Sequence, residues 1–318
     1  MRLNLVHFDD ALIRQPLFRE AGGKLGARER DLRDVGPEVR LWARANALAD
    51  VRKRLAPIFD GPDAAEPLVT WMGSGDFHHM TALIVGALAR ASAEPLTIVA
   101  FDNHPDWVAY RGGVHCGSWV RHVLDQKVVE RVVGVGMTGR DLAWPEFKRA
   151  ALDHVAAGRL VLFPMTGAAS FVAGNYRHGA AHEQKGRRLS WKGLPPAFTA
   201  ADAERVFSAV QTGAIYITID KDVLAEADAV TNWDQGRLAL PDLLLWLGAL
   251  AARFKVAGVD IIGDHSRPQF KGSKLSRILK HGEILFDHPR RHRDEGQTAA
   301  VNQRTNLSIL KTLETVLC

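Results

Sequence analysis

The chain has 318 residues, of which 47% are hydrophobic and 24% charged, so it can bury a full core as one or two globular domains. Its net charge is only +5, and its two cysteines exclude a disulfide framework and a thiolate metal site. No apolar run reaches the roughly 18 residues that span a bilayer, and the first ten residues lack a secretory pattern, so a cytoplasmic protein is expected.

The first half of the chain is predicted to alternate strands with helices. Residues 28–55 are rich in Arg, Leu and Ala and predict a helix that ends before Pro57, and residues 61–63 predict a turn. Apolar runs predict strands at 3–8, 68–72, 96–101 and 128–135, and helices are expected at 79–91, 118–126 and 142–155.

The second half continues this alternation around one long irregular stretch. Residues 166–199 are rich in Gly, Ala and Pro and are expected to form a long loop or lid, with or without short elements of its own. Residues 268–318 are expected to form a basic segment followed by a C-terminal helix at 302–317. Strands are expected at 160–163, 214–219 and 256–262, and helices at 200–210 and 240–254. No repeat or linker divides the chain, which predicts a single domain over residues 1–318.

The strands are too apolar to have a face in water, which indicates an α/β protein with a largely parallel sheet covered on both sides. Ligands gather at the carboxyl ends of the strands in such sheets. Three polar motifs directly follow predicted strands: residues 75–79 (Gly-Asp-Phe-His-His), 102–106 (Asp-Asn-His-Pro-Asp) and 220–222 (Asp-Lys-Asp). The three motifs are therefore expected to meet at one edge of the sheet.

Residues two apart in extended backbone point the same way. Asp102, His104 and Asp106 have this spacing, as do Asp220 and Asp222. Each aspartate alone is a common turn former or helix cap. Placed after buried strands, however, unpaired carboxylates are costly unless a cation neutralises them. Oxygen ligands with one or two imidazoles suit Mn²⁺, and less selectively Fe²⁺, Co²⁺ or Zn²⁺, so two divalent ions, first of all Mn²⁺, are predicted.

These motifs resemble those of the arginase/agmatinase ureohydrolases of the arginase–deacetylase superfamily. That family carries Gly-Gly-Asp-His-Ser, Asp-Ala-His-x-Asp and Ser-x-Asp-x-Asp at three strand ends. Residues 102–106 are similar to the second motif and residues 218–222 (Thr-Ile-Asp-Lys-Asp) to the third, whereas the first motif is altered at 75–79. The resemblance covers residues 71–264 and implies a three-layer α/β/α sandwich around a largely parallel central sheet.

The resemblance also implies a ligand set and a proton donor. One metal would be held by His78, Asp102, Asp106 and Asp220, and the other by Asp102, His104, Asp220 and Asp222. His79 is the alternative to His78. The family's proton-shuttling histidine is similar in position to His115. The family's guanidinium-binding glutamate corresponds to Gly263, which leaves Asp264, one residue along, as the candidate for substrate binding.

The resemblance implies a dimetal hydrolase that cleaves a linear C–N bond of a guanidino, amidino or formimino small molecule with a metal-bridging hydroxide, while His115 protonates the leaving nitrogen. One alternative is an amide deacylase of the same superfamily, which would release a carboxylate. The other is a non-catalytic metal-binding or assembly protein whose basic stretch 271–293 contacts an anionic partner. No nucleic-acid-binding motif accompanies that stretch, so a nucleic-acid partner is not expected. The resemblance also implies a homo-oligomer.

Overall fold

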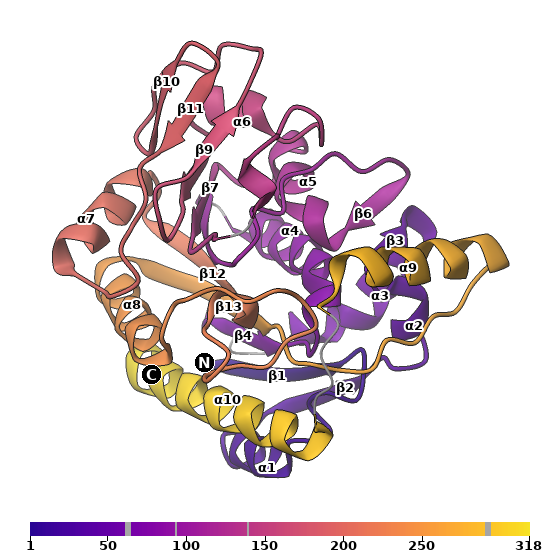
Figure 1. Ribbon diagram of the computed structural model, residues 1–318. Coiled ribbons are helices and arrows are strands. Elements are labelled where there is room, and N and C mark those ends of the chain that lie inside the picture. Colours follow the sequence, from indigo (N-terminus) through magenta and orange to yellow (C-terminus); the bar gives the residue numbers. More distant parts are fainter. Residues whose placement is uncertain (61–64, 93, 139, 290–293) are drawn as a thin grey trace.

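The computed structural model describes residues 1–60, 65–92, 94–138, 140–289 and 294–318, and the turn predicted at 61–63 lies outside them. At its centre is an eight-stranded parallel sheet in the order β2-β1-β4-β13-β12-β5-β7-β8 (Figure 1). Its strands are β1 (Arg2–His7), β2 (Arg28–Asp31), β4 (Leu68–Trp71), β5 (Leu96–Phe101), β7 (Arg131–Val135), β8 (Leu160–Phe163), β12 (Ala214–Asp220) and β13 (Lys255–Ile262). The predicted α/β class with a largely parallel sheet is confirmed.

Helices cover both faces of this sheet and bury a separate hydrophobic core on each (Figure 1). One core includes α3 (Ala45–Leu55), α4 (Thr81–Ala91), α5 (Trp119–Asp125) and α6 (Leu152–Ala156). The other includes α1 (Pro16–Lys24), α7 (Ala200–Ala209), α8 (Leu240–Arg253) and α10 (Glu295–Leu317). Alternate residues of β12 enter the two cores, Tyr216 the first and Ile217 the second. The molecule is therefore a three-layer α/β/α sandwich, and the strands are apolar because both faces are covered.

Two smaller sheets lie outside the central one. The segment predicted as a long loop or lid contains a three-stranded antiparallel sheet of β9 (Ala169–Phe171), β10 (His182–Lys185) and β11 (Arg188–Trp191). Trp191, at the end of β11, packs edge-on against Trp107 with ring centroids 5.9 Å apart. Strands β3 (Trp42–Arg44) and β6 (Gly113–His115) form a two-stranded antiparallel sheet. Because Trp191 and Leu189 are buried, the first small sheet is anchored to the core.

The helix predicted over 28–55 is wrong in its first half. Residues 28–31 form the edge strand β2 beside β1, and a short helix α2 (Gly36–Val39) and β3 precede the real helix α3. Leu41, with φ of +66°, is in the left-handed region and cannot belong to a helix. The spacing of apolar residues therefore predicted a helix where a charged edge strand, β2, and two short elements precede α3.

Two further helix predictions differ from the structure. Of residues 142–155, only the last few are in a helix, α6, because Arg149 has a φ of +51° that breaks the pattern. The basic segment contains a helix, α9 (Lys274–Asp287), that was not predicted. Residues 290–293 of the segment lie outside the described range. The C-terminal helix α10 begins at Glu295, earlier than the predicted residue 302. Within the described parts of the chain, no helix is long and apolar enough to cross a membrane.

Candidate metal centre

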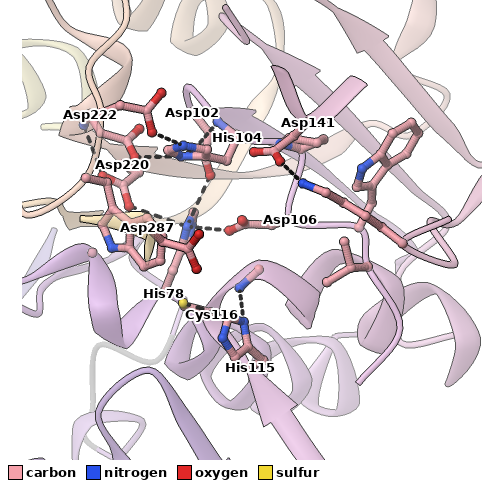
Figure 2. A pocket seen from close by; sticks show the side chains of 18 of the residues that line it. His78, Asp102, His104, Asp106, His115, Cys116, Asp141, Asp220, Asp222 and Asp287 are labelled. Carbon is pink, nitrogen blue, oxygen red and sulfur yellow. Dashed lines mark hydrogen bonds and ion pairs between the residues drawn. The ribbon is translucent and has the colours of Figure 1, made fainter. Parts of the chain in front are cut away.

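The three polar motifs meet at the carboxyl end of the central sheet. Asp220 is the last residue of β12, residues 102–106 follow the neighbouring β5, and a short 3-10 helix, Gly75–Met80, follows β4. Together they line a cavity of about 700 Å³ (Figure 2). Six of the predicted side chains meet there and are called the ligand set: His78, Asp102, His104, Asp106, Asp220 and Asp222.

His78 faces three carboxylates of the ligand set with a single ring nitrogen. Its Nδ1 lies 3.2 Å from Asp102 Oδ2, 3.0 Å from Asp106 Oδ2 and 3.7 Å from Asp220 Oδ2. Asp106 is held in place by Trp119, whose indole Nε1 donates to its Oδ2 at 2.7 Å. Of the two alternatives in the first motif, His78 is therefore the histidine that meets the carboxylates.

His104 faces the other side of the cluster. Its Nδ1 lies 2.9 Å from Asp222 Oδ2 and 3.7 Å from Asp102 Oδ1, and its Nε2 lies 2.8 Å from Asp234 Oδ1. The backbone N–H of His104 donates to Asp102 Oδ1 at 2.7 Å, which fixes the loop between the two ligands. This loop is not extended, and Asp106 has a φ of +45°, so a turn rather than strand geometry brings residues 102–106 together.

Two glycines approach Asp220 so closely that neither position admits a side chain. A Cβ at Gly75 would lie 2.7 Å from Asp220 Oδ2, and one at Gly263 would lie 2.4 Å from Asp220 Oδ1. Gly263 also has a φ of +93°, which disfavours any other residue. The position that corresponds to the family glutamate is thus filled by the carboxylate of a predicted metal ligand.

The four carboxylates of the ligand set outnumber its two imidazoles, and against the effect of burial they raise the pKa of both His78 and His104 well above the ordinary value. Burial and the charge of Asp102 raise the pKa of Asp106 to about 6 and that of Asp222 to about 7. Burial and both neighbouring carboxylates raise the pKa of Asp220 well above its ordinary value. Carboxylates that repel each other in a buried place fit a bound cation, which would restore their ordinary ionisation.

The donor atoms form two overlapping groups of metal-binding size. His78, Asp102 and Asp220 form one, and Asp102, His104 and Asp222 form the other, with the ligand atoms of each group within 4.8 Å of one another. Asp102 belongs to both. A shared carboxylate between two groups of hard oxygen and imidazole ligands is the arrangement that a pair of divalent ions requires.

His78 is oriented from behind by residues that the sequence analysis missed. Its Nε2 donates to Thr218 Oγ1 at 3.0 Å, and the Thr218 hydroxyl donates to Asp260 Oδ1 at 2.5 Å. The phenol of Tyr216 donates to the other Asp260 oxygen at 2.8 Å. The sequence did contain a sign of Asp260, because this aspartate interrupts the apolar residues of β13 that follow Lys255. Asp234, which holds His104, comes from the loop after β12 and gave no such signal.

His79 and His115 lie apart from the carboxylate cluster. His79 is fully buried, and burial lowers its pKa well below the ordinary value, so it is a neutral side chain of the interior. His115 lines the cavity, but the Gly117 N–H donates to its Nδ1 at 2.8 Å. The proton is therefore on Nε2, which donates to Glu283 Oε1 on α9 at 2.5 Å. Both ring nitrogens of His115 are thus engaged.

Asp264 does not reach the cavity, contrary to the substrate-binding role suggested for it. Its side chain is fully buried, and its Oδ1 lies 2.6 Å from the Nζ of Lys221. Gln15 also donates to Asp264 Oδ1, at 2.9 Å. Lys221 points away from the ligand set between Asp220 and Asp222, so the ion pair lies behind the site and supports the loop. This placement corrects the expectation for Asp264.

No protein-family model matches the chain. A curated protein of Thermotoga maritima, described as uncharacterized, is 26% identical over 202 residues. The matched region covers 64% of this chain and 60% of that protein, so the chain spans less than two thirds of the relative's length.

Solved structures are similar over almost the whole chain. Proclavaminate amidino hydrolase from Streptomyces clavuligerus aligns with 98% of this chain and 90% of its own, with a TM-score of 0.56 and 17% identity. Formimidoylglutamase from Bacillus subtilis aligns over 98% and 87%, with a TM-score of 0.57 and 14% identity. Arginase from Bacillus subtilis aligns over 98% of both chains, with a TM-score of 0.57 and 12% identity. The chain therefore has the arginase-type ureohydrolase fold.

Proposed function

We propose that the protein is a metal-dependent hydrolase that cleaves a linear C–N bond in a guanidino, amidino or formimino small molecule. The observation that carries this proposal is the convergence of the ligand set into two groups that share Asp102. The set comes from three separate strand ends and places four carboxylates against only two imidazoles. A structural role for so many buried carboxylates would be costly.

In this proposal, one divalent ion is held by His78, Asp102, Asp106 and Asp220. The second is held by Asp102, His104, Asp220 and Asp222. The donor chemistry favours Mn²⁺. When bound, the ions would supply a water-derived nucleophile near neutral pH and stabilise the charge that develops on the heteroatoms attached to the attacked carbon. The chain itself orients the two imidazoles through Thr218 and Asp234.

The size of the cavity and the similar structures support the choice of substrate class. A volume of about 700 Å³ is in the range of small-molecule sites. The similar structures include a proclavaminate amidino hydrolase, a formimidoylglutamase and an arginase, whose names refer to amidino, formimidoyl and arginine substrates. His115 is the proposed proton donor for the leaving nitrogen, and it would have to exchange its contact with Glu283 for one with the substrate.

The experiment is a metal-dependent assay on a matched panel of substrates. Purified protein would be stripped with a chelator, reloaded with Mn²⁺ and assayed for ammonia or urea release from guanidino, amidino and formimino compounds, beside the corresponding amides. We expect Mn²⁺-dependent activity that Asp102→Ala abolishes, because that carboxylate belongs to both groups. Asp125→Ala is the matched control, since Asp125 belongs to a separate surface group with Asp153 and His154.

Two results would contradict the proposal. Release of a carboxylate from the amides alone would identify an amide deacylase instead. No turnover of any compound by protein that retains two Mn²⁺ per chain would indicate a non-catalytic metal-binding protein.

A further inference from the structure

The carboxylates of the cavity differ in whether they have a positive partner. The aspartates that line it are Asp102, Asp106, Asp141, Asp220, Asp222, Asp234 and Asp287. Four of these seven belong to the ligand set. Asp234 lies 2.8 Å from His104 Nε2, and Asp141 pairs with Lys148. Across the described ranges of the chain, Asp287 is the lining aspartate that has neither a place in the ligand set nor an ion-pair partner.

Asp287 is the last residue of α9, and this position is unfavourable for a carboxylate. The C-terminus of a helix carries partial negative charge, which repels an anion. Glu283 lies one turn earlier on the same helix, and like charges at this spacing are destabilising. Partial burial, with the added charges of Glu283 and Asp141, raises the pKa of Asp287, and the charges of Lys148 and His288 offset only part of this effect. Asp287 is nevertheless exposed and lines the cavity, so a cationic ligand there could reach its carboxylate and offset these repulsions.

Two other carboxylates close to the site, Glu283 and Asp264, are already engaged. Glu283 accepts the proton-bearing Nε2 of His115 at 2.5 Å. Asp264 is held by Lys221 behind the site, and Gly263 has no room for a side chain next to Asp220. Figure 2 shows the Asp287 side chain drawn with the ligand set around the same cavity. Outside the ligand set, and within the described residues, Asp287 at the end of α9 is therefore the lining aspartate left to meet a positively charged group that enters the cavity.

We propose that Asp287 binds the cationic amidine or guanidine group of the substrate and thereby selects charged substrates over neutral amides. This inference rests on the proposed function, since it assigns the specificity of the same site. It requires that the substrate lie between α9 and the ligand set. It also implies that Asp287 lowers the stability of the free protein and raises the affinity for the substrate.

The test uses two probes of the same shape and different charge, benzamidine (cationic) and benzamide (neutral). Their binding to Mn²⁺-loaded wild type, Asp287→Asn and Asp287→Glu would be measured by calorimetry, without turnover. We expect Asp287→Asn to bind benzamidine about 10- to 100-fold more weakly, because a charge-assisted hydrogen bond is lost. Benzamide binding should not change. Asp287→Glu, which keeps the charge, should retain part of the benzamidine affinity.

Thermal unfolding gives a second readout that a purely structural role would move in the opposite direction. Asp287→Asn should raise the melting temperature by about 1 to 3 °C, because a carboxylate leaves a helix C-terminus. Glu314→Gln removes the same charge from an exposed position of α10 and should change neither the melting temperature nor benzamidine binding.

Equal affinity of wild type and Asp287→Asn for benzamidine would overturn the inference, as would a lower melting temperature of the variant with unchanged affinity. Failure of the proposed function is a separate result. If the Mn²⁺-loaded wild type hydrolyses no compound of the panel but loses benzamidine binding in Asp287→Asn, the cation site stands and the hydrolase assignment falls.

Discussion

At the scale of single residues, the orientation of His78 depends on side chains that never touch the cavity. The register of β12 and β13 places Thr218 beside Asp260, and both are fully buried. Asp260 accepts from Thr218 and Tyr216, so the Thr218 hydroxyl is left to accept the Nε2 proton of His78. Nε2 is thereby held by Thr218 and Nδ1 faces the carboxylates of Asp102 and Asp106, which raise the pKa of His78 against the effect of burial. Partners of this kind orient metal-ligating histidines and raise their basicity.

Thr218→Val tests this chain of hydrogen bonds. We expect the variant to bind Mn²⁺ about 10- to 100-fold more weakly, the usual cost of losing such a partner. Metal titration of the stripped protein would measure it. Thr70→Val is the matched control, because Thr70 is a buried threonine on β4, on the other side of β13 and in register with Asp260, whose hydroxyl has no hydrogen-bond partner within the described residues. Equal Mn²⁺ affinity of Thr218→Val and wild type would show that the ring is fixed by other contacts.

The residues of the ligand set were the ones that sequence reasoning could find. Asp102, His104 and Asp222 sit in short motifs after apolar runs, and a local pattern of that kind is visible without a structure. Asp264 was misplaced, because nothing in the sequence shows that Lys221 turns back to meet it. Asp287 could not be predicted either, because nothing in the sequence shows that the end of α9 lies beside motifs so distant in the chain.

At the scale of elements, α9 contributes a buried lysine to the support of the site. The Nζ of Lys280 donates to the Glu38 carbonyl at 2.6 Å and to the Trp42 carbonyl at 3.0 Å, and it lies 4.3 Å from the centroid of the Trp42 ring. These contacts join α9 to the segment around α2 and β3. Burial lowers the pKa of Lys280 to about 8. At least this one lysine of the basic segment therefore binds within the protein and is not available to an external anionic partner.

This pKa predicts how stability depends on pH. Between pH of about 8 and the ordinary lysine value of 10.5, the unfolded chain binds a proton at Lys280 that the folded chain does not. The free energy of unfolding of the wild type should therefore rise with pH in this window relative to Lys280→Met, by on the order of 3 kcal/mol in total. Urea unfolding at several pH values would measure the difference. Lys274→Met, at the exposed start of α9, should follow the wild type, and a flat difference for Lys280→Met would contradict the lowered pKa.

Elements were predictable from sequence when burial on both sides made them uniformly apolar. Strand β8 was placed correctly, and β12 and β13 to within one residue, because nothing but a buried strand fits such runs. Strand β2 was missed because its four residues are all charged and its position at the edge of the sheet is a tertiary fact. Helix α9 was missed because its charge was noticed and its apolar spacing was not.

At the scale of the whole molecule, one buried polar network ties together distant parts of the chain. The Nζ of Lys221 contacts Asp264 Oδ1 at 2.6 Å and Asn306 Oδ1 at 2.9 Å. Asn306 also accepts from Trp71 Nε1 at 3.1 Å and donates to Gln15 Oε1 at 2.7 Å. Helices α1 and α10 are thereby fastened to the loop that carries Asp220 and Asp222. The ligand set is thus supported by two helices that cover one face of the sheet.

Lys221→Met should lower the free energy of unfolding by about 3 to 5 kcal/mol, because it leaves the buried carboxylate of Asp264 without its partner. The double variant Lys221→Met/Asp264→Leu should recover a large part of this loss, since removing both charges avoids the uncompensated one. Urea unfolding of the two single variants and the double variant completes the cycle. Additive losses in the double variant would show that the two side chains are not coupled.

The order of the strands has a consequence for how the polypeptide acquires this shape during synthesis. Strands β2, β1 and β4 form one block of the sheet and β5, β7 and β8 another, and the blocks are joined only through β13 and β12. Every strand of both blocks has been synthesised by residue 163, whereas the joining strands begin at residue 214. Until then the inner edges of β4 and β5 stay unpaired, and such edges attract other chains. Closing contacts between residues so far apart is slow, so the growing protein depends on its last third to bring His78 and Asp102 together.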